Sequence, residues 1–149
     1  MDLLEELLGL TAELDAAGVD YALIGGLAVA VWGVPRATKD IDLLILPGTV
    51  EAAKAAAARR GFTLPGGPLT FRDGVSIDRV SRVRDGLLLT VDFMRVNTNL
   101  TGAWDSRRRL PTGDSTLSVV SRDALIEMKL AAARPQDIAD VEKLREIDR

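Results

Sequence analysis

The spacing of hydrophobic residues changes along the chain and predicts where helices and strands lie. Leucines recur at helical spacing over residues 3–14, which predicts a first helix ending near Asp15. The apolar run 19–24 predicts a short buried strand, and the small apolar residues 26–32 predict a helix packed tightly beneath it. The continuous aliphatic run 41–46 predicts a central strand. The first third of the chain therefore alternates between helix and strand.

The second half of the chain is richer in strand patterns. Residues 76–83 alternate, residues 87–96 form an apolar run, and Asp85-Gly86 between them predicts a β-hairpin. A short strand is expected at 116–120. We interpret Pro65-Gly66-Gly67-Pro68 as a turn and Trp104 to Arg109 as a basic surface segment. Helices are predicted from Thr49 to about Gly61, from Ser121, and from Pro135 to about Ile147.

This element order predicts an α+β fold, a small mixed sheet flanked by helices, which we expect on one side of it. With 149 residues the chain is expected to be one domain, 1–149, with C-terminal helices from about residue 121. The acidic N-terminus is unlike a signal peptide and no apolar run is long enough to span a membrane, so we expect a cytoplasmic protein.

Composition then narrows the chemistry. The chain has no cysteine and no histidine, which excludes disulfides, thiolate metal sites, zinc catalysis by histidine ligands and a histidine base. Acid–base work falls to carboxylates, lysine or tyrosine. A formal net charge of −3 argues against broad attraction to nucleic acid or membrane. Arg107-Arg108-Arg109 is a local exception, either a solvated loop or a surface for an RNA acceptor.

Two carboxylates enter an otherwise aliphatic strand. Alternation along a strand puts Asp40 and Asp42 on one face, roughly 6–7 Å apart at the backbone. Asp92, in the middle of the 87–96 run, is expected to join them if its strand pairs beside Asp42. Three carboxylates of this kind would hold one or two Mg²⁺ ions. The alternatives are a turn cap with a surface pair to Arg36 or Lys39, and a solvent-facing Asp92.

Candidate phosphate-binding groups surround these acids. Gly25-Gly26, at the end of a predicted strand, would let backbone N–H groups approach a phosphate, although such a pair is often only a turn. Arg36 and Lys39 flank the acids and either bind phosphate or are solvated. Lys129, on the apolar side of its helix, either contacts phosphate or snorkels to the surface.

Together, Gly25-Gly26, the thirteen-residue spacer, Asp40-Ile41-Asp42 and Asp92 resemble the nucleotidyltransferase superfamily. Residues 20–46 look most like the branch of AbiEii-type toxin nucleotidyltransferases, and the lincosamide and aminoglycoside nucleotidyltransferases share a similar stretch. Many members of the superfamily carry Gly-Ser where this chain has Gly25-Gly26. AbiEii-type proteins often carry Lys-Asp where it has Gln136-Asp137.

The resemblance implies Mg²⁺-dependent transfer of a nucleoside monophosphate from an NTP, such as ATP, to a hydroxyl acceptor. Asp40, Asp42 and Asp92 would be catalytic and hold metal, and Gly25, Gly26, Arg36, Lys39 and Lys129 would bind nucleotide. The acceptor is open between RNA, a protein and a small molecule, and a toxin–antitoxin or phage-defence role with a cognate protein partner is plausible. The alternative is a nucleotidyltransferase-like module that binds nucleotide or a partner with little turnover.

Overall fold

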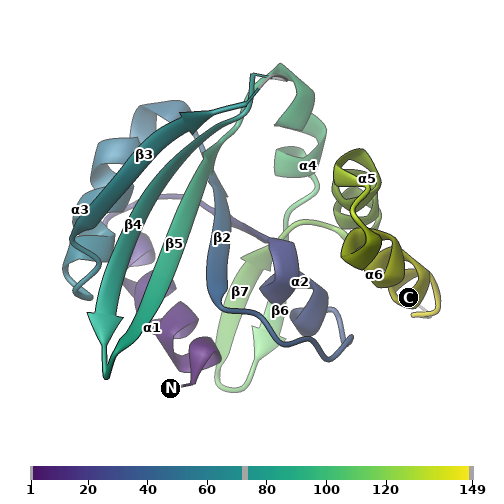
Figure 1. Ribbon diagram of the computed structural model, residues 1–149, viewed down its shortest axis with the longest axis horizontal. Coiled ribbons are helices and arrows are strands. Elements are labelled where there is room, and N and C mark those ends of the chain that lie inside the picture. Colours follow the sequence, from purple (N-terminus) through teal and green to yellow (C-terminus); the bar gives the residue numbers. More distant parts are fainter. Residues whose placement is uncertain (1, 72–73, 148–149) are drawn as a thin grey trace.

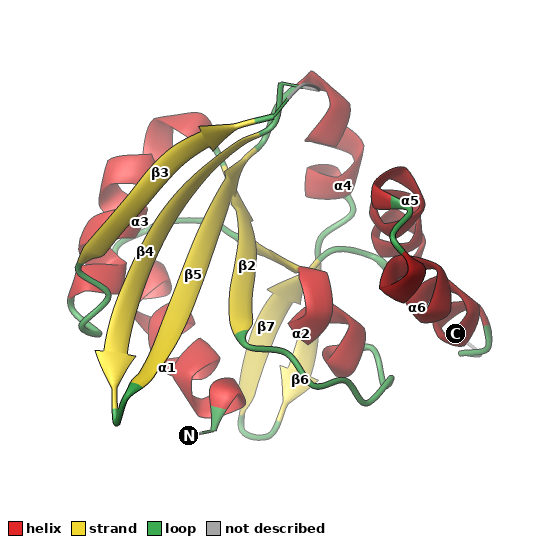
Figure 2. Cartoon of the chain, viewed as in Figure 1, coloured by secondary structure: helices red, strands yellow, loops and turns green. Residues whose placement is uncertain are grey.

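The computed structural model describes residues 2–71 and 74–147, which form a seven-stranded mixed sheet and the helices around it (Figure 1). The strand order across the sheet is β3-β4-β5-β2-β1-β7-β6 (Figure 2). The strands are β1 (Ala22–Ile24), β2 (Asp40–Ile45), β3 (Leu64–Thr70), β4 (Ser76–Arg84), β5 (Leu87–Arg95), β6 (Arg108–Thr112) and β7 (Ser115–Val119). The predicted α+β class, a small mixed sheet flanked by helices, is confirmed.

Six α-helices and two short 3₁₀ helices are described around the sheet. The α-helices are α1 (Leu3–Ala16), α2 (Gly25–Val31), α3 (Val50–Ala58), α4 (Thr101–Asp105), α5 (Arg122–Ala132) and α6 (Pro135–Arg145). The 3₁₀ helices are η1 (Pro47–Thr49) and η2 (Thr98–Leu100). Within the described ranges, no helix is both long enough and apolar enough to cross a membrane.

Helices lie on both faces of the sheet, so the expectation that they would lie on one side is wrong. Helices α1 and α3 lie behind the sheet in Figure 1, and α2 lies in front of it. The rear layer encloses the aliphatic core, in which Leu10, Ile41, Leu43 and Phe93 are fully buried. Successive side chains of a strand point to opposite faces of the sheet. The residues of β2 and β5 that neighbour these buried ones along the chain therefore point to the front face, where the candidate site lies.

Local sequence explains several element ends. The side chain of Asp2 accepts hydrogen bonds from the first turn of α1, and the hydroxyl of Ser121 accepts one from the backbone N–H of Ala124 in α5. Between β4 and β5, Asp85 and Gly86 both have positive φ, at 52° and 76°. A two-residue hairpin turn of this kind needs that conformation, so the predicted hairpin is confirmed.

One prediction about a turn is wrong, because Pro65 to Pro68 lie within β3. The segment from Trp104 to Arg109 has exposed arginines, as predicted for a basic surface segment, but it also contains the end of α4 and the start of β6, a strand that was not predicted. Both β3 and β6 are edge strands with mostly exposed side chains. An edge strand tolerates proline and needs no apolar alternation, so its sequence gives little strand signal.

Candidate active site

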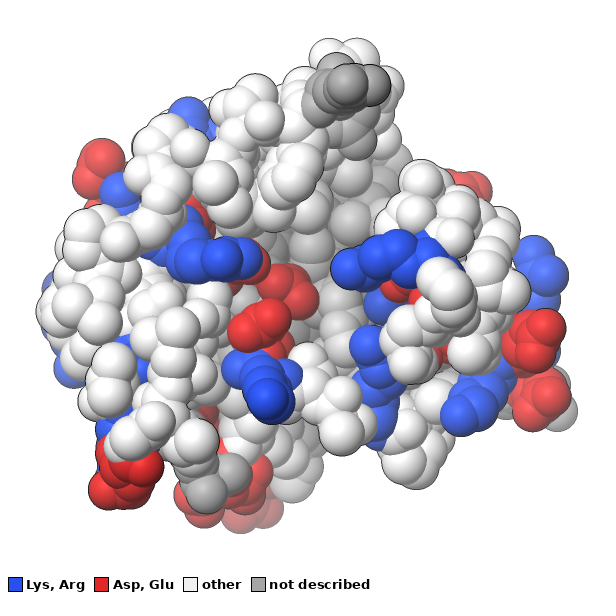
Figure 3. Space-filling model, viewed as in Figure 1, with Lys and Arg blue, Asp and Glu red and all other residues white. Residues whose placement is uncertain are grey.

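The three predicted carboxylates lie on the front face of the sheet, on the neighbouring strands β2 and β5. In the parallel pairing of β2 with β5, Asp42 lies opposite Asp92, and Asp40 lies opposite Thr90. We call Asp40, Asp42 and Asp92 the acid row. Figure 3 shows acidic side chains in a hollow at the centre of this face, with basic side chains at its borders. The predicted juxtaposition of Asp42 and Asp92 is therefore present, while the catalytic roles remain predictions.

Asp42 is the electrostatically strained member of the acid row. Burial raises its pKa to about 7, and the charges of Asp92 and Asp40 add to the increase. Lys129 and Arg79 oppose that rise without cancelling it. Among the described residues, neither Asp40 nor Asp42 forms an ion pair. A divalent cation would supply the missing positive charge at this position.

Asp92 differs because it has a cation of its own. Arg79, opposite Asp92 in the antiparallel pairing of β4 with β5, donates from Nε to Oδ1 at 2.7 Å and from Nη2 to Oδ2 at 3.0 Å. This bidentate geometry is a strong form of ion pair. In the part of the chain that the structure describes, no three carboxylates gather closely enough for a metal cluster. The residues therefore fit a cation at Asp40 and Asp42, and Asp92 could join only after Arg79 releases it.

The glycine pair lies directly against the acid row. Gly25 opens α2 with a φ of +73°, and a Cβ at this position would overlap Oδ2 of Asp42. A Cβ on Gly26 would lie 2.9 Å from Oγ1 of Thr38. Both positions therefore need glycine for close approach, and Gly25 needs it for its backbone conformation too. Phosphate binding by this backbone remains a prediction.

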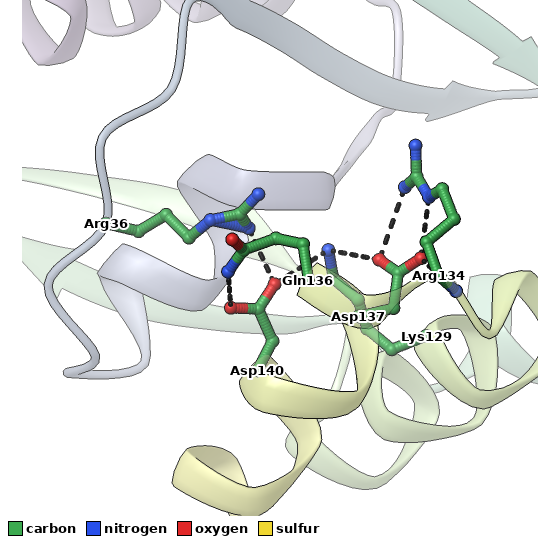
Figure 4. Close-up of polar contacts among 6 residues, drawn as sticks. All are labelled: Arg36, Lys129, Arg134, Gln136, Asp137 and Asp140. Atoms are coloured by element: carbon green, nitrogen blue, oxygen red, sulfur yellow. Dashed lines mark hydrogen bonds and ion pairs between the residues drawn. The ribbon is translucent and has the colours of Figure 1, made fainter.

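A second group of charged side chains joins α5, α6 and the loop before β2 (Figure 4). We call Arg36, Lys129, Arg134, Asp137 and Asp140 the charge cluster. The ammonium of Lys129 lies 3.2 Å from Oδ1 of Asp137 and 3.2 Å from Oδ2 of Asp140. Lys129 is only 6% exposed, so the snorkelling alternative is wrong.

Each aspartate of the charge cluster has a further cation. Arg134 donates from Nε to Oδ2 of Asp137 at 2.7 Å, and Arg36 donates from Nη1 to Oδ2 of Asp140 at 2.6 Å. The hydrogen bond from Arg134 is the main cause that lowers the pKa of Asp137 to about 2. Arg36 is thus paired with Asp140 and not with the acid row, which contradicts the surface-pair alternative for Arg36. Lys39 is exposed and forms no ion pair among the described residues.

Sequence reasoning missed three members of these networks, namely Arg79, Arg134 and Asp140. A signal for Arg79 was present, because the two-residue turn at Asp85-Gly86 fixes Arg84 opposite Leu87 and therefore Arg79 opposite Asp92. Arg134 and Asp137 also had a local signal, because Pro135 marks the start of α6 and puts them at its N-cap and N3 positions. No comparable signal places Asp140 against Arg36, since these two residues lie 104 positions apart in the sequence.

The arginine run lies in a different region. The guanidinium of Arg107 stacks on Trp104, with 3.7 Å between its central carbon and the ring centroid, and Arg109 donates to the hydroxyl of Thr116 at 2.7 Å. Arg107, Arg108 and Arg109 line a small pocket of about 270 Å³ together with Asp15 and Asp20. The two carboxylates offset part of the basic charge, and none of the acid row lines this pocket.

No protein-family model and no curated protein matches the chain by sequence. Solved structures do match it. The lincomycin-bound lincosamide antibiotic adenylyltransferase LnuA aligns with a TM-score of 0.70 at 16% identity, covering 97% of this chain and 97% of LnuA. A candidate nucleotidyltransferase from Thermotoga maritima aligns with a TM-score of 0.68 at 16% identity, covering 95% of this chain and 91% of its own.

A third similar structure is ANT(2″)-Ia in complex with adenylyl-2″-tobramycin, with a TM-score of 0.65 at 16% identity. The alignment covers 94% of this chain and 85% of the ANT(2″)-Ia chain. At identities this low, the structural similarity shows a common fold and nothing more. The chain therefore has the fold of these nucleotidyltransferases, and the structural resemblance that the motifs predicted is confirmed.

Proposed function

We propose that the protein is a nucleotidyltransferase that moves a nucleoside monophosphate from an NTP to an acceptor hydroxyl and releases pyrophosphate. The observation that carries this proposal is the acid row, where the pKa of Asp42 rises to about 7 beside Asp92 and Asp40. Like charges are crowded here on a nucleotidyltransferase fold, at a cost that a bound cation would remove.

Asp40 and Asp42 are the residues that would hold Mg²⁺. When bound, the ion neutralises triphosphate charge and orients the α-phosphate. The backbone of Gly25 and Gly26 lies beside Asp42, where its N–H groups can approach phosphate oxygens. Lys39 is exposed near the acids and supplies a cation for the phosphates.

Asp92 is the proposed general base. In the transfer step the acceptor oxygen forms a bond to the α-phosphorus, the bond from that phosphorus to the pyrophosphate oxygen breaks, and Asp92 takes the hydroxyl proton. Arg79 must loosen its bidentate hold on Asp92 before the carboxylate can accept a proton. Lys129 and Arg36 act on the site indirectly, because both are already paired with aspartates of the charge cluster.

The test is nucleotide transfer itself. The full chain is incubated with Mg²⁺ and each of four α-³²P-labelled NTPs, with cell extract as the source of acceptor. We expect a labelled product with the wild-type protein and none with Asp42→Asn. Full activity of Asp42→Asn would refute the proposed role of the acid row. Within this proposal a toxin–antitoxin or phage-defence role and a cytoplasmic location rest on the sequence alone.

A second candidate function is nucleotide binding without turnover. The observation that favours it is the Arg79–Asp92 pair, which occupies both oxygens of the third carboxylate. This candidate predicts that wild-type protein and Asp42→Asn bind ATP in equilibrium dialysis and that neither transfers label. It also predicts that Arg79→Gln, which frees Asp92, leaves the protein inactive, whereas the enzyme proposal expects transfer to be retained.

A further inference from the structure

A large cavity opens beside the acid row and takes no part in the proposed nucleotide site. Its volume is about 930 Å³, within the range of pockets that hold small molecules. It lies between β4, β5, α4 and α5. Its lining is mostly apolar and includes Ile77, Met94, Leu100, Ala103, Met128 and Ala131.

Strand register fixes the position of the cavity relative to the chemistry. Met94 follows Asp92 by two residues on β5, and Ile77 precedes Arg79 by two residues on β4, so each points to the same face as its charged neighbour. Met94 and Ile77 also lie opposite each other in the sheet. The apolar floor of the cavity is therefore the next row of side chains after the Arg79–Asp92 pair, roughly 6–7 Å along the strands.

A charge interaction links the two sites from the helical side. Arg134 lines the cavity, and its charge interacts with Asp42 as well as with Asp137. A molecule in the cavity thus has a route to Asp92 along the sheet and to the acid row past Arg134. A hydroxyl at one end of such a molecule can reach the proposed general base.

The charge of the lining limits what can bind. Among the described residues that line the cavity, Glu127 and Arg134 are the charged ones, and Arg134 is already paired with Asp137. An RNA strand needs several basic groups along its phosphates, and a polyamine acceptor needs several acids. An apolar floor with one unpaired carboxylate at Glu127 suits neither of them.

We propose that this cavity is the acceptor site and that the acceptor is a small amphipathic molecule with a hydroxyl group and at most one charge. The inference rests on the proposed function and names its second substrate. The apolar body of the acceptor packs on Met94, Ile77 and Met128. Its hydroxyl points toward Asp92, which takes the proton as the oxygen bonds to the α-phosphorus and pyrophosphate leaves.

The test blocks the cavity without disturbing the fold. Gly102 lines the cavity, and a Cβ added there has no neighbour within 4 Å. Gly102→Trp should therefore fold, since glycine is also a poor helix former. Gly48→Trp is the matched control, because Gly48 is equally open and does not line the cavity.

Two measurements are made on the full chain. Nile red, an uncharged fluorescent dye, reports binding in the cavity, and we expect Gly102→Trp to weaken its affinity at least tenfold while Gly48→Trp and Asp42→Asn leave it unchanged. Transfer from the labelled NTP is measured onto cell extract separated into small molecules, RNA and protein. We expect label in the small-molecule fraction, reduced at least tenfold by Gly102→Trp and unchanged by Gly48→Trp.

The outcomes separate the two proposals. Label confined to RNA or protein overturns the acceptor assignment and leaves the nucleotidyltransferase proposal standing. So does small-molecule labelling that persists in Gly102→Trp. A wild-type protein that labels none of the fractions overturns the proposed function and the acceptor role together, and Nile red binding then shows only that the cavity is open to apolar compounds.

Discussion

The acid row and the charge cluster contain the same kind of side chain in opposite electrostatic states. In the charge cluster, two buried aspartates meet Lys129 and two arginines, and the pKa of Asp137 falls to about 2. In the acid row, Arg79 is paired with Asp92, neither Asp40 nor Asp42 forms an ion pair among the described residues, and the pKa of Asp42 rises to about 7. The first region is neutralised by the chain itself, whereas the second lacks positive charge.

The difference separates a structural network from a binding site. A buried carboxylate with its own hydrogen-bonded cations holds elements together, here α5 to α6 and to the loop that carries Arg36. A buried carboxylate short of cations destabilises the fold unless a ligand supplies them. On this comparison, substitutions in the charge cluster should lower stability, and substitutions in the acid row should abolish function while stability is kept or increased.

The largest effect on stability is expected for Lys129→Met. Methionine fills similar volume but leaves Asp137 and Asp140 without the cation that lies between them. Removing one partner of a buried ion pair costs about 3–5 kcal/mol, which we expect as the loss in the free energy of unfolding by urea. Lys39→Met, at an exposed lysine, is the control and should change it little. A loss below about 1 kcal/mol for Lys129→Met would contradict the structural role.

In the acid row, a substitution should raise stability rather than lower it when no metal is bound. The pKa of Asp42 is about 7 in the fold, above its ordinary value of 3.8, so the folded state holds a proton that the unfolded state has lost between these pH values. Stability should therefore fall as pH rises from about 4 to about 7. Asp42→Asn removes this dependence on pH and should be more stable than wild type at pH 8 in EDTA. Since one pKa unit corresponds to about 1.4 kcal/mol, we expect a difference of a few kcal/mol in the free energy of unfolding.

The measurement is urea unfolding of both proteins at pH 4, 6 and 8 in EDTA. Asp40→Asn serves as the comparison, because Asp40 is exposed and should alter the profile less. The charge cluster contributes in another window, since the lowered pKa of Asp137 means that its stabilisation is lost only as pH falls from 3.8 toward 2. Equal pH profiles for wild type and Asp42→Asn would show that Asp42 is not strained.

Much of the acid row could be predicted from the sequence because it depends on local geometry. Asp40 and Asp42 share a face through simple alternation, and Asp92 follows once its strand pairs beside β2. The glycine pair is likewise local, since Gly25 has a positive φ at a strand-to-helix turn. These features need only one or two adjacent elements to be placed correctly.

The charge cluster could not be predicted because it depends on the angle between two helices. Ala133 adopts a left-handed conformation with a φ of 53°, which alanine rarely does, and this turn brings Asp137 and Asp140 back to Lys129. The edge strands β3 and β6 were not predicted for another reason, since their mostly exposed side chains show no alternation of apolar and polar residues. The sequence thus reveals local patterns better than contacts made by tertiary packing.

Mg²⁺ should reverse the strain in the acid row. At pH 8 the ion would bind the folded state through Asp40 and Asp42, and it would stabilise wild type by about 2.7 kcal/mol at one hundred times its Kd. Asp42→Asn should lose most of this gain. The gain in stability is measured by thermal unfolding with and without Mg²⁺. The same experiment with Ca²⁺ tests whether the site prefers Mg²⁺, the smaller of the two ions. An equal shift for both proteins would place the metal elsewhere.

Gly25→Ala should have a smaller effect on stability. Alanine in a left-handed conformation costs about 1–2 kcal/mol, and its Cβ would in addition overlap Oδ2 of Asp42. Gly18→Ala is the matched control, because Gly18 has a similar φ of +71° and open space around it. The excess loss in Gly25→Ala over Gly18→Ala, measured by urea unfolding, reports the contact with Asp42. Equal losses would mean that Asp42 moves aside freely.

The smallest effect is expected for Gln136→Lys, which installs the lysine that AbiEii-type proteins often carry. Gln136 is exposed and donates to Oδ1 of Asp140 at 3.0 Å, while Arg36 and Lys129 already bind the other oxygen of that carboxylate. A further cation at an exposed position adds at most about 0.5 kcal/mol to stability. Affinity for ATP, measured by equilibrium dialysis, should change less than twofold, because the charge cluster is neutralised by its own cations. A tenfold rise in that affinity would show that the cluster lacks a cation and faces phosphate, and it would remove the distinction between the two regions.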